Sequence, residues 1–265
     1  MASRTLSEQN TNAFPLAGGA GWMAAEPGRE QAEIACDVFS GGAAGRLFAL
    51  RDEHAPSSDR FRLLANRLAG LRRSIPLKIL HVTSATVGEG KSVIAANLAI
   101  TLAWRPQARV LLIEGDLRRP SLAELFGGNL PEGIGDWWQR GAEAPAPNLY
   151  RVKGTSLAVM FAGSTGVSPE ILNSPRVPAM LEYIAARFDW VVVDSPPVLD
   201  AADAARWAGL ADGTLLVMRA GCASRDEVEL ALAGLDGARL VGTVFNESPF
   251  SGGRHGWHHG EGHIA

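Results

Sequence analysis

The feature that most restricts the fold of this chain is a glycine-rich loop at residues 85–92, which reads Ala-Thr-Val-Gly-Glu-Gly-Lys-Ser. A run typical of a buried strand precedes the loop at 79–83, and an apolar run typical of a helix follows it at 93–104. Strand, loop, Lys-Ser and helix in this order distinguish a phosphate-binding P-loop from an ordinary glycine turn. The sequence therefore predicts that the chain binds a nucleoside triphosphate.

Several residues of this loop suit a triphosphate, each for its own reason. Gly88 and Gly90 permit backbone dihedrals that a side chain forbids, so that successive N–H groups can turn toward phosphate oxygens. The helix that begins near Lys91 adds the positive end of its dipole. The Lys91 ammonium is expected near the β- and γ-phosphates, and the Ser92 hydroxyl is expected to hold Mg²⁺. The predicted nucleotide-binding residues of the loop are Thr86, Val87, Gly88, Glu89, Gly90, Lys91, Ser92 and Val93.

Apolar runs alternate with helical patterns along the rest of residues 57–247. The short runs predict strands at 78–84, 109–114, 157–162, 190–194, 213–219 and 239–245. The segments between them predict helices at 91–104, 120–126, 174–188, 201–209 and 224–235. Strands that are apolar on both faces are typical of a parallel sheet whose crossovers are helical. The sequence thus predicts an α/β fold of P-loop NTPase type: a mostly parallel sheet flanked by helices in three layers, α/β/α.

The two ends of the chain have a different composition from this nucleotide-binding domain at 57–247. Residues 1–56 are rich in Ala, Gly, Ser and charged residues without a sustained period, which predicts a flexible N-terminal arm with one short helix near 29–39. From about Ser57, apolar residues at helical spacing predict a helix that Pro76 ends. The Gly/His-rich tail at 248–265 is expected to be disordered, with its histidines solvated rather than bound to a metal.

Charge and composition narrow the possible partners and the compartment. The formal net charge of −3 provides no broad basic field, so nucleic-acid binding is not expected. Cys36 and Cys222 lie far apart in the sequence, which favours a reducing compartment over a disulfide scaffold. We find neither an apolar run of membrane-spanning length nor a secretory signal pattern, so a cytoplasmic location is expected.

Three carboxylates follow apolar strands at the edge where parallel sheets bind ligands. Asp194 ends the run Trp-Val-Val-Val-Asp, in the position of an acid that orients Mg²⁺. Glu114 and Asp116 are two residues apart, so an extended strand end would point both the same way, as a pair that binds metal or accepts a proton. The alternative for any one of these acids is that it caps the following turn or helix. The predicted catalytic residues are Lys91, Glu114, Asp116 and Asp194, and the predicted metal ligands are Ser92, Glu114 and Asp194.

Three motifs together resemble the bacterial tyrosine kinases of capsular and exopolysaccharide synthesis. They are residues 84–92, residues 113–120 (Ile-Glu-Gly-Asp-Leu-Arg-Arg-Pro) and residues 188–197, which end in Asp-Ser-Pro-Pro. The resemblance covers roughly residues 57–247. It implies the fold of the partition and cell-division ATPases, ATP and Mg²⁺ as cofactors, and phosphorylation of tyrosines. It also implies assembly into rings, a position for Asn246 near the adenine, and recruitment to the inner face of the membrane by a polysaccharide co-polymerase that governs chain length.

The chain departs from the family pattern at several positions. Glu114 stands where the family has the first of two aspartates, which moves the carboxylate by one methylene. The family's subunit-contact motif, Glu-x-x-Arg-x-x-Arg, is matched within the predicted 57–73 helix with Asp59 for Glu and Ala65 for the second Arg. The whole chain has two tyrosines, Tyr150 and Tyr183, and neither lies in the C-terminal tail. Phosphorylation of a tail tyrosine cluster is therefore excluded.

These observations leave three functions open. The first is a kinase or kinase-like regulator with an external substrate, and the second is a non-catalytic, ATP-dependent scaffold that signals to a membrane partner. The third, a partition- or division-type ATPase, ranks behind them. That class places an extra lysine at the start of its P-loop, where this chain has Ala85, Thr86 and Val87.

Overall fold

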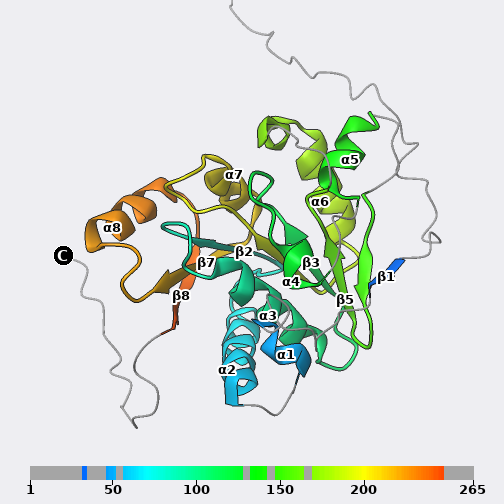
Figure 1. The fold of residues 1–265 in the computed structure, drawn as a ribbon, viewed down its shortest axis with the longest axis horizontal. Helices are drawn as coiled ribbons and strands as arrows, with labels where there is room; N and C mark the ends of the chain where they lie inside the picture. Colours follow the sequence, from blue (N-terminus) through cyan, green and yellow to red (C-terminus); the bar gives the residue numbers. More distant parts are fainter. Residues whose placement is uncertain are drawn as a thin grey trace, which may run out of the picture.

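The computed structural model describes residues 32–34, 46–51, 56–127, 132–141, 147–163 and 169–247, and these residues form one sheet with helices on both faces (Figure 1). The strands run in the spatial order β1-β4-β5-β3-β6-β2-β7-β8. Their bounds are β1 (Ala32–Ile34), β2 (Ile79–Ser84), β3 (Val110–Glu114), β4 (Tyr150–Val152), β5 (Leu157–Met160), β6 (Trp190–Asp194), β7 (Gly213–Arg219) and β8 (Leu240–Asn246). The helices are α1 (Phe48–Arg51), α2 (Pro56–Leu71), α3 (Lys91–Ala103), α4 (Leu122–Leu125), α5 (Ile134–Gln139), α6 (Arg176–Ala185), α7 (Asp203–Leu210) and α8 (Arg225–Gly234), with a 3-10 helix at Pro169–Asn173.

Six neighbouring strands, from β5 to β8, are parallel, and β4 joins their edge in the antiparallel direction. In a parallel sheet all carboxyl ends lie at one edge, so the segments that follow β2, β3 and β6 meet there. The register places Asp194 between Val82 of β2 and Glu114 of β3. Strand pairing thus brings the P-loop and the predicted acids to the same edge.

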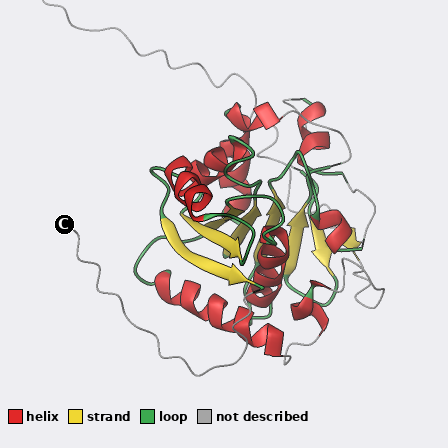
Figure 2. Ribbon diagram, turned by 60° about the vertical axis from the view of Figure 1, so that its left-hand side comes forward, coloured by secondary structure: helices red, strands yellow, loops and turns green. Residues whose placement is uncertain are grey.

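The central strands β3, β5 and β6 are buried on both faces, which produces two separate apolar layers. Leu112 and Val192 pack with α1, α2, α3 and α4 in one layer, whereas their chain neighbours Leu111 and Val191 pack with α5, α6 and α7 in the other. In Figure 1 α1, α2 and α3 lie below the sheet and α5, α6 and α7 lie above it, and Figure 2 shows the sheet between the two layers. Side chains in a strand alternate between the faces, so an apolar run fills both layers. The predicted three-layer α/β/α fold is confirmed.

The sequence predicted six of the strands to within a few residues, β2, β3, β5, β6, β7 and β8, but missed β1 and β4 at one end of the sheet. Residues 32–34, where the sequence predicts part of a helix, form β1, paired in parallel with β4. The helix predicted near 29–39 is therefore wrong at these residues. Pairing with a neighbouring strand is a tertiary contact, and it outweighs the weak local preference of a three-residue segment. The helix α5 was also not predicted.

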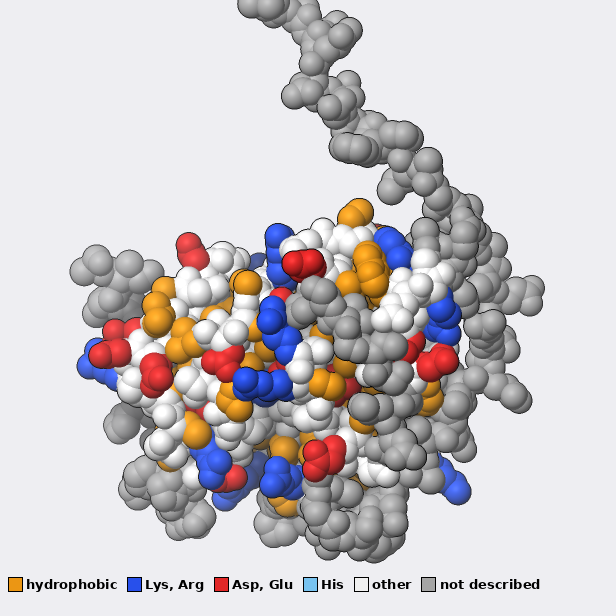
Figure 3. All heavy atoms as spheres, turned by 45° about the horizontal axis from the view of Figure 1, so that its top comes forward, with side chains coloured by type: hydrophobic (Ala, Val, Ile, Leu, Met, Phe, Trp, Pro, Cys, Tyr) orange, Lys and Arg blue, Asp and Glu red, His pale blue; other side chains and the backbone are white. Residues whose placement is uncertain are grey.

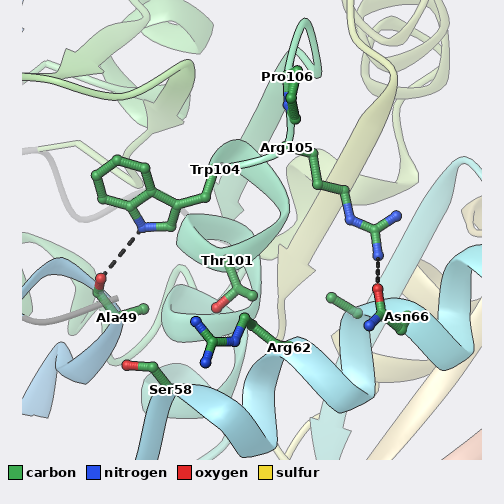
Figure 4. A pocket seen from close by; sticks show the side chains of 9 residues that line it. Ala49, Ser58, Arg62, Asn66, Thr101, Trp104, Arg105 and Pro106 are labelled. Carbon is green, nitrogen blue, oxygen red and sulfur yellow. Dashed lines mark hydrogen bonds between the residues drawn. The ribbon is translucent and has the colours of Figure 1, made fainter. Parts of the chain in front are cut away.

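Residues 46–51, which the sequence assigns to the arm, pack into the core instead. Leu47 is fully buried, and Ala49 is 2% exposed. Trp104 at the end of α3 donates from Nε1 to the Ala49 carbonyl at 3.3 Å, a contact shown in Figure 4. The other arm residues, at 1–31, 35–45 and 52–55, and the tail at 248–265 lie outside the described residues, as do the tail histidines.

Two further features of the described residues bear on the expectations about partners. None of their helices combines the length and the apolar character that crossing a bilayer requires. On the face shown in Figure 3, lysine and arginine side chains alternate with acidic and apolar ones.

Candidate functional site

The P-loop connects β2 to α3 in a left-handed path that depends on its glycines. Gly88 and Gly90 have φ angles of 88° and 87°, which side-chain-bearing residues rarely adopt. A Cβ atom at Gly90 would also collide with the side-chain amide of Asn246. Both glycines are thus required by backbone geometry, as the motif predicts, and Gly90 is required by a close contact as well.

Glu89 uses its side chain to hold the loop in shape. The side chain is buried, and its carboxylate accepts hydrogen bonds from the backbone N–H of Thr86 at 3.0 Å and of Arg219 at 3.4 Å. Asn246 Nδ2 donates to the Glu89 carbonyl at 2.9 Å, so the end of β8 supports the same turn. The Glu89 carboxylate is therefore turned into the loop, and Asn246 lies against the P-loop backbone.

Lys91 and Asp116 form an ion pair at the carboxyl edge of the sheet. Lys91 Nζ lies 3.3 Å from Asp116 Oδ2, and both side chains are largely buried. Asp116 Oδ1 accepts a hydrogen bond from the Arg119 backbone N–H at 3.0 Å, which fixes the plane of the carboxylate. The pair joins the P-loop to the segment after β3 and places a carboxylate beside the lysine expected to contact phosphate.

Asp194 is a buried carboxylate without a hydrogen-bond partner among the described residues. Burial raises its pKa to about 7; the Lys91 charge and the Ser92 hydroxyl oppose this rise, and Glu114 and Asp116 add to it. Such an isolated carboxylate is costly unless a cation satisfies it. Carboxylate and hydroxyl oxygens are the donors that Mg²⁺ takes in triphosphate sites. Asp194 and Ser92 therefore fit the magnesium ion that the P-loop implies.

Glu114 has a different environment from the other two acids. Its Oε1 accepts from the backbone N–H groups of Ser121 and Leu122, both at 2.6 Å, and its Oε2 accepts from Ala162 N–H at 2.9 Å. Burial raises its pKa most strongly, while these three amides lower it and Asp116 raises it further. The carboxylate thus ties the start of α4 and the segment after β5 to the end of β3. We infer that Glu114 holds the site together, in place of the predicted metal-binding and proton-accepting roles.

Glu114→Asp tests this structural role. The shorter side chain cannot reach all three amides, so we expect the free energy of unfolding to fall by about 1–3 kcal/mol, because a buried amide is left unpaired. We expect no gain in turnover. Urea denaturation and ATP turnover check the two parts, with Glu182→Asp on the exposed surface of α6 as the control. If Glu114→Asp is as stable as the wild type and turns over ATP faster, the carboxylate at position 114 acts in catalysis and the structural role is wrong.

A buried histidine, His81, links β2 to the strands on either side. Its Nε2 lies 2.6 Å from Ser195 Oγ, and its Nδ1 lies 3.2 Å from Thr214 Oγ1. Thr83 Oγ1 donates to the Pro196 carbonyl at 2.8 Å, so β2 holds the segment that follows Asp194 at two points. Sequence reasoning missed this network. Its only signal was a titratable residue within an apolar strand.

The burial of His81 makes stability depend on pH. Burial lowers its pKa from 6.5 to about 3, so folded His81 stays neutral while the unfolded chain takes up a proton below pH 6.5. Protonation then favours unfolding as pH falls. Between pH 7 and pH 5 we expect the wild type to lose about 2 kcal/mol of unfolding free energy relative to His81→Gln, which does not titrate there. Asp194, whose raised pKa acts with the opposite sign, is common to both proteins and cancels. Chemical denaturation at several pH values gives the two curves; parallel curves would contradict the expectation.

The structure brings most of the predicted site together. Residues 86–93 form the loop and the first turn of α3, and Asp116 and Asp194 lie at its side. Lys91 and Ser92 also line a cavity of about 210 Å³ with Gly88 and Gly90. Arg46 lines the same cavity. The sequence assigns this residue to the N-terminal arm, and no motif identifies it as a binding residue.

Comparison with known proteins shows which family has a similar sequence. Residues 77–205 match the family model described as ParA, NUBPL iron-transfer P-loop NTPase. The tyrosine-protein kinase YwqD of Bacillus subtilis is 28% identical over 209 residues, which cover 77% of this chain and 87% of that protein. The putative tyrosine-protein kinase EpsB of Ralstonia solanacearum is 32% identical over 76% of this chain, and this match spans 27% of EpsB.

Solved structures agree with these sequence matches. The BceF tyrosine kinase domain is 30% identical, with a TM-score of 0.65 over 75% of this chain and 81% of that domain. The chimerical protein CapA2B2 shares the fold, with a TM-score of 0.69 and 24% identity over 77% of this chain and 91% of that one. The chain therefore belongs to the bacterial tyrosine kinases of capsule and exopolysaccharide synthesis, whose nucleotide-binding domain is a ParA-type P-loop NTPase.

Proposed function

We propose that the chain binds ATP with Mg²⁺ at this site and transfers the γ-phosphoryl group to a tyrosine of another protein. The observation that carries the proposal is the meeting of Lys91 and Ser92 of the P-loop with Asp116 and the unpartnered carboxylate of Asp194. This set combines a phosphate-binding ammonium, two oxygen donors for a divalent cation, and an acid able to accept a proton. Phosphoryl transfer needs positioning and charge stabilisation from its protein more than covalent chemistry, and these residues supply both.

Each residue has a distinct part in this function. The backbone N–H groups of the P-loop and the Lys91 ammonium bind the phosphates, and Ser92 and Asp194 would hold Mg²⁺. When bound, the cation neutralises charge on the phosphate oxygens. Asp116 accepts the proton of the incoming tyrosine hydroxyl, since its carboxylate lies beside Lys91 and Glu114 is engaged by amides.

The positions of the chain's own tyrosines favour an external substrate. Tyr150 lies in β4 with its ring 5.5 Å from that of Phe161. Tyr183 lies in α6, and the Arg187 guanidinium stacks 3.7 Å from the centre of its ring. Both rings are held by the fold. A hydroxyl from another protein is therefore the better acceptor.

We further propose that the chain works on the cytoplasmic side of the membrane with a polysaccharide co-polymerase as its partner. Support comes from relatives such as the succinoglycan biosynthesis transport protein ExoP of Rhizobium meliloti, 35% identical over 148 residues. The exposed surface of α2, which carries the altered subunit-contact motif, is the proposed contact between copies of the chain. Within that motif Arg62 pairs with Asp59 of the same helix.

An ATP-dependent scaffold without phosphotransfer is the second candidate. The amide contacts of Glu114 favour this candidate. The motif at 113–120 supplies two acids, and these contacts engage one of them, so that only Asp116 remains available for catalysis.

One experiment separates the two functions. Purified protein is incubated with ATP labelled at the γ-phosphate, Mg²⁺ and a synthetic Glu/Tyr copolymer. Label on tyrosine that depends on Asp116, tested with Asp116→Asn, supports the kinase. Tight ATP binding without transfer or hydrolysis supports the scaffold. Failure of the wild type to bind ATP with Mg²⁺ would overturn both.

A further inference from the structure

The segment that precedes α2 delivers an arginine to the phosphate site. Arg46 lines the same cavity as Gly88, Lys91 and Ser92 of the P-loop, and Ser121 and Glu124 line its other side. It lies 45 residues before the P-loop lysine in the sequence, outside every motif of the nucleotide site. Arg46 is exposed, and no ion pair joins it to another residue in the described part of the chain.

The backbone at Arg46 is fixed by a buried amide of the P-loop helix. Asn97, on α3 and fully buried, donates from Nδ2 to the Arg46 carbonyl at 2.9 Å and accepts at Oδ1 from the Ala49 N–H at 3.0 Å. Asn97 Nδ2 also donates to the Val93 carbonyl at 2.8 Å, in the first turn of the same helix. One side chain therefore holds both the start of α3 and residues 46–49 in a fixed relation.

Two further contacts add to this anchor. Leu47, the next residue after Arg46, is fully buried in the core, and the Trp104 indole N–H donates to the Ala49 carbonyl (Figure 4). The chain is thus anchored at the Arg46 carbonyl and directly after it, while the Arg46 side chain is exposed at the cavity. This arrangement resembles a positioned but unsatisfied ligand-binding group more than a solvated surface arginine.

We propose that Arg46 is a phosphate-contacting residue of the nucleotide site, supplied by the N-terminal segment and positioned by Asn97. An arginine is always protonated, and its planar fork of N–H donors matches two phosphate oxygens at once. Because Lys91 is already paired with Asp116, an arginine in the same cavity adds positive charge for the negative charges of the triphosphate. Nucleotide binding is consequently coupled to the docking of residues 46–51 on α3.

This inference rests on the proposed binding of ATP, and its test separates the two. The affinities of wild type, Arg46→Ala and Arg46→Lys for ATP with Mg²⁺ are measured by titration calorimetry. Arg206→Ala, at an exposed position on α7, is the matched control. We expect about a tenfold loss for Arg46→Ala, a smaller loss for Arg46→Lys, and wild-type affinity for Arg206→Ala. The affinity of Arg46→Ala should also fall less steeply with added salt than that of wild type, because one phosphate contact is missing.

The role of Asn97 is tested through Arg46. Asn97→Ala should lower ATP affinity in the wild type and have no further effect on affinity in Arg46→Ala, with thermal unfolding of each apo-protein as the folding control. Wild-type affinity in Arg46→Ala would overturn the inference and leave the proposed function standing. An unaltered wild type that fails to bind ATP with Mg²⁺ would overturn the proposed function itself.

Discussion

Replacing Lys91 with alanine is expected to weaken binding of ATP with Mg²⁺ by about 100-fold or more. Lys91 is the only cationic residue of the P-loop, and hydrogen bonds to charged groups are worth about 1.5–3 kcal/mol each. The loss should be larger for ATP than for AMP, because the lysine is expected at the β- and γ-phosphates. Turnover should fall with binding, since the same charge stabilises the transferring group.

The control for Lys91→Ala is Lys153→Ala, which removes an exposed lysine from the turn after β4. Calorimetry gives the affinities, and thermal unfolding of each apo-protein shows whether the fold is retained. Removal of Lys91 leaves Asp116 with its Arg119 N–H bond, so the fold should persist. Equal affinities of Lys91→Ala and wild type for ATP would remove the basis of the proposed site.

Asp194→Asn is expected to lower Mg²⁺-dependent turnover about 100- to 1,000-fold while making the apo-protein more stable. The loss follows because a neutral amide is a poor substitute for a carboxylate next to Mg²⁺ and phosphate. The apo-protein gains stability because the wild-type carboxylate is buried without a hydrogen-bond partner among the described residues. At pH 8, above its raised pKa of about 7, the wild type carries this unfavourable charge, and the variant should exceed it by up to about 4 kcal/mol.

These opposite changes distinguish a functional carboxylate from a structural one. Turnover across a Mg²⁺ titration and urea denaturation at pH 8 measure them, and Asp236→Asn in the exposed turn after α8 is the control. A destabilised Asp194→Asn would mean that the carboxylate supports the fold. Unchanged turnover would mean that it holds no cation.

The general organisation of the site could be predicted from the sequence because the motifs that indicate it consist of residues close together in the chain. A P-loop consists of consecutive residues, and its strand, glycines, Lys91 and helix follow one another in the chain. The central strands were readable for a similar reason, since a run buried on both faces must be apolar throughout. The edge strand β1 and its neighbour β4 are short, and their existence depends on pairing with each other and with β5.

The roles of the three acids were decided only by folding. Sequence spacing placed Glu114 and Asp116 on the same side of an extended strand end, but β3 ends at Glu114 and the chain turns there. Amides of Ser121, Leu122 and Ala162, from two other segments, then take up the Glu114 carboxylate. Asp116 turns instead to Lys91, and Asp194 receives no hydrogen-bonding partner from the described residues.

The sequence by itself determined the α/β fold, the nucleotide loop and the acids that end neighbouring strands, because periodicity and motif spacing depend on adjacent residues. The tertiary structure decided which acid pairs with Lys91, how His81 supports the segment after Asp194, and that Arg46 lines the same cavity as Lys91 and Ser92. Each of these depends on hydrogen bonds between segments far apart in the chain. The donors and acceptors of these hydrogen bonds come together only when the sheet has assembled, so a local sequence pattern cannot predict which of them will pair.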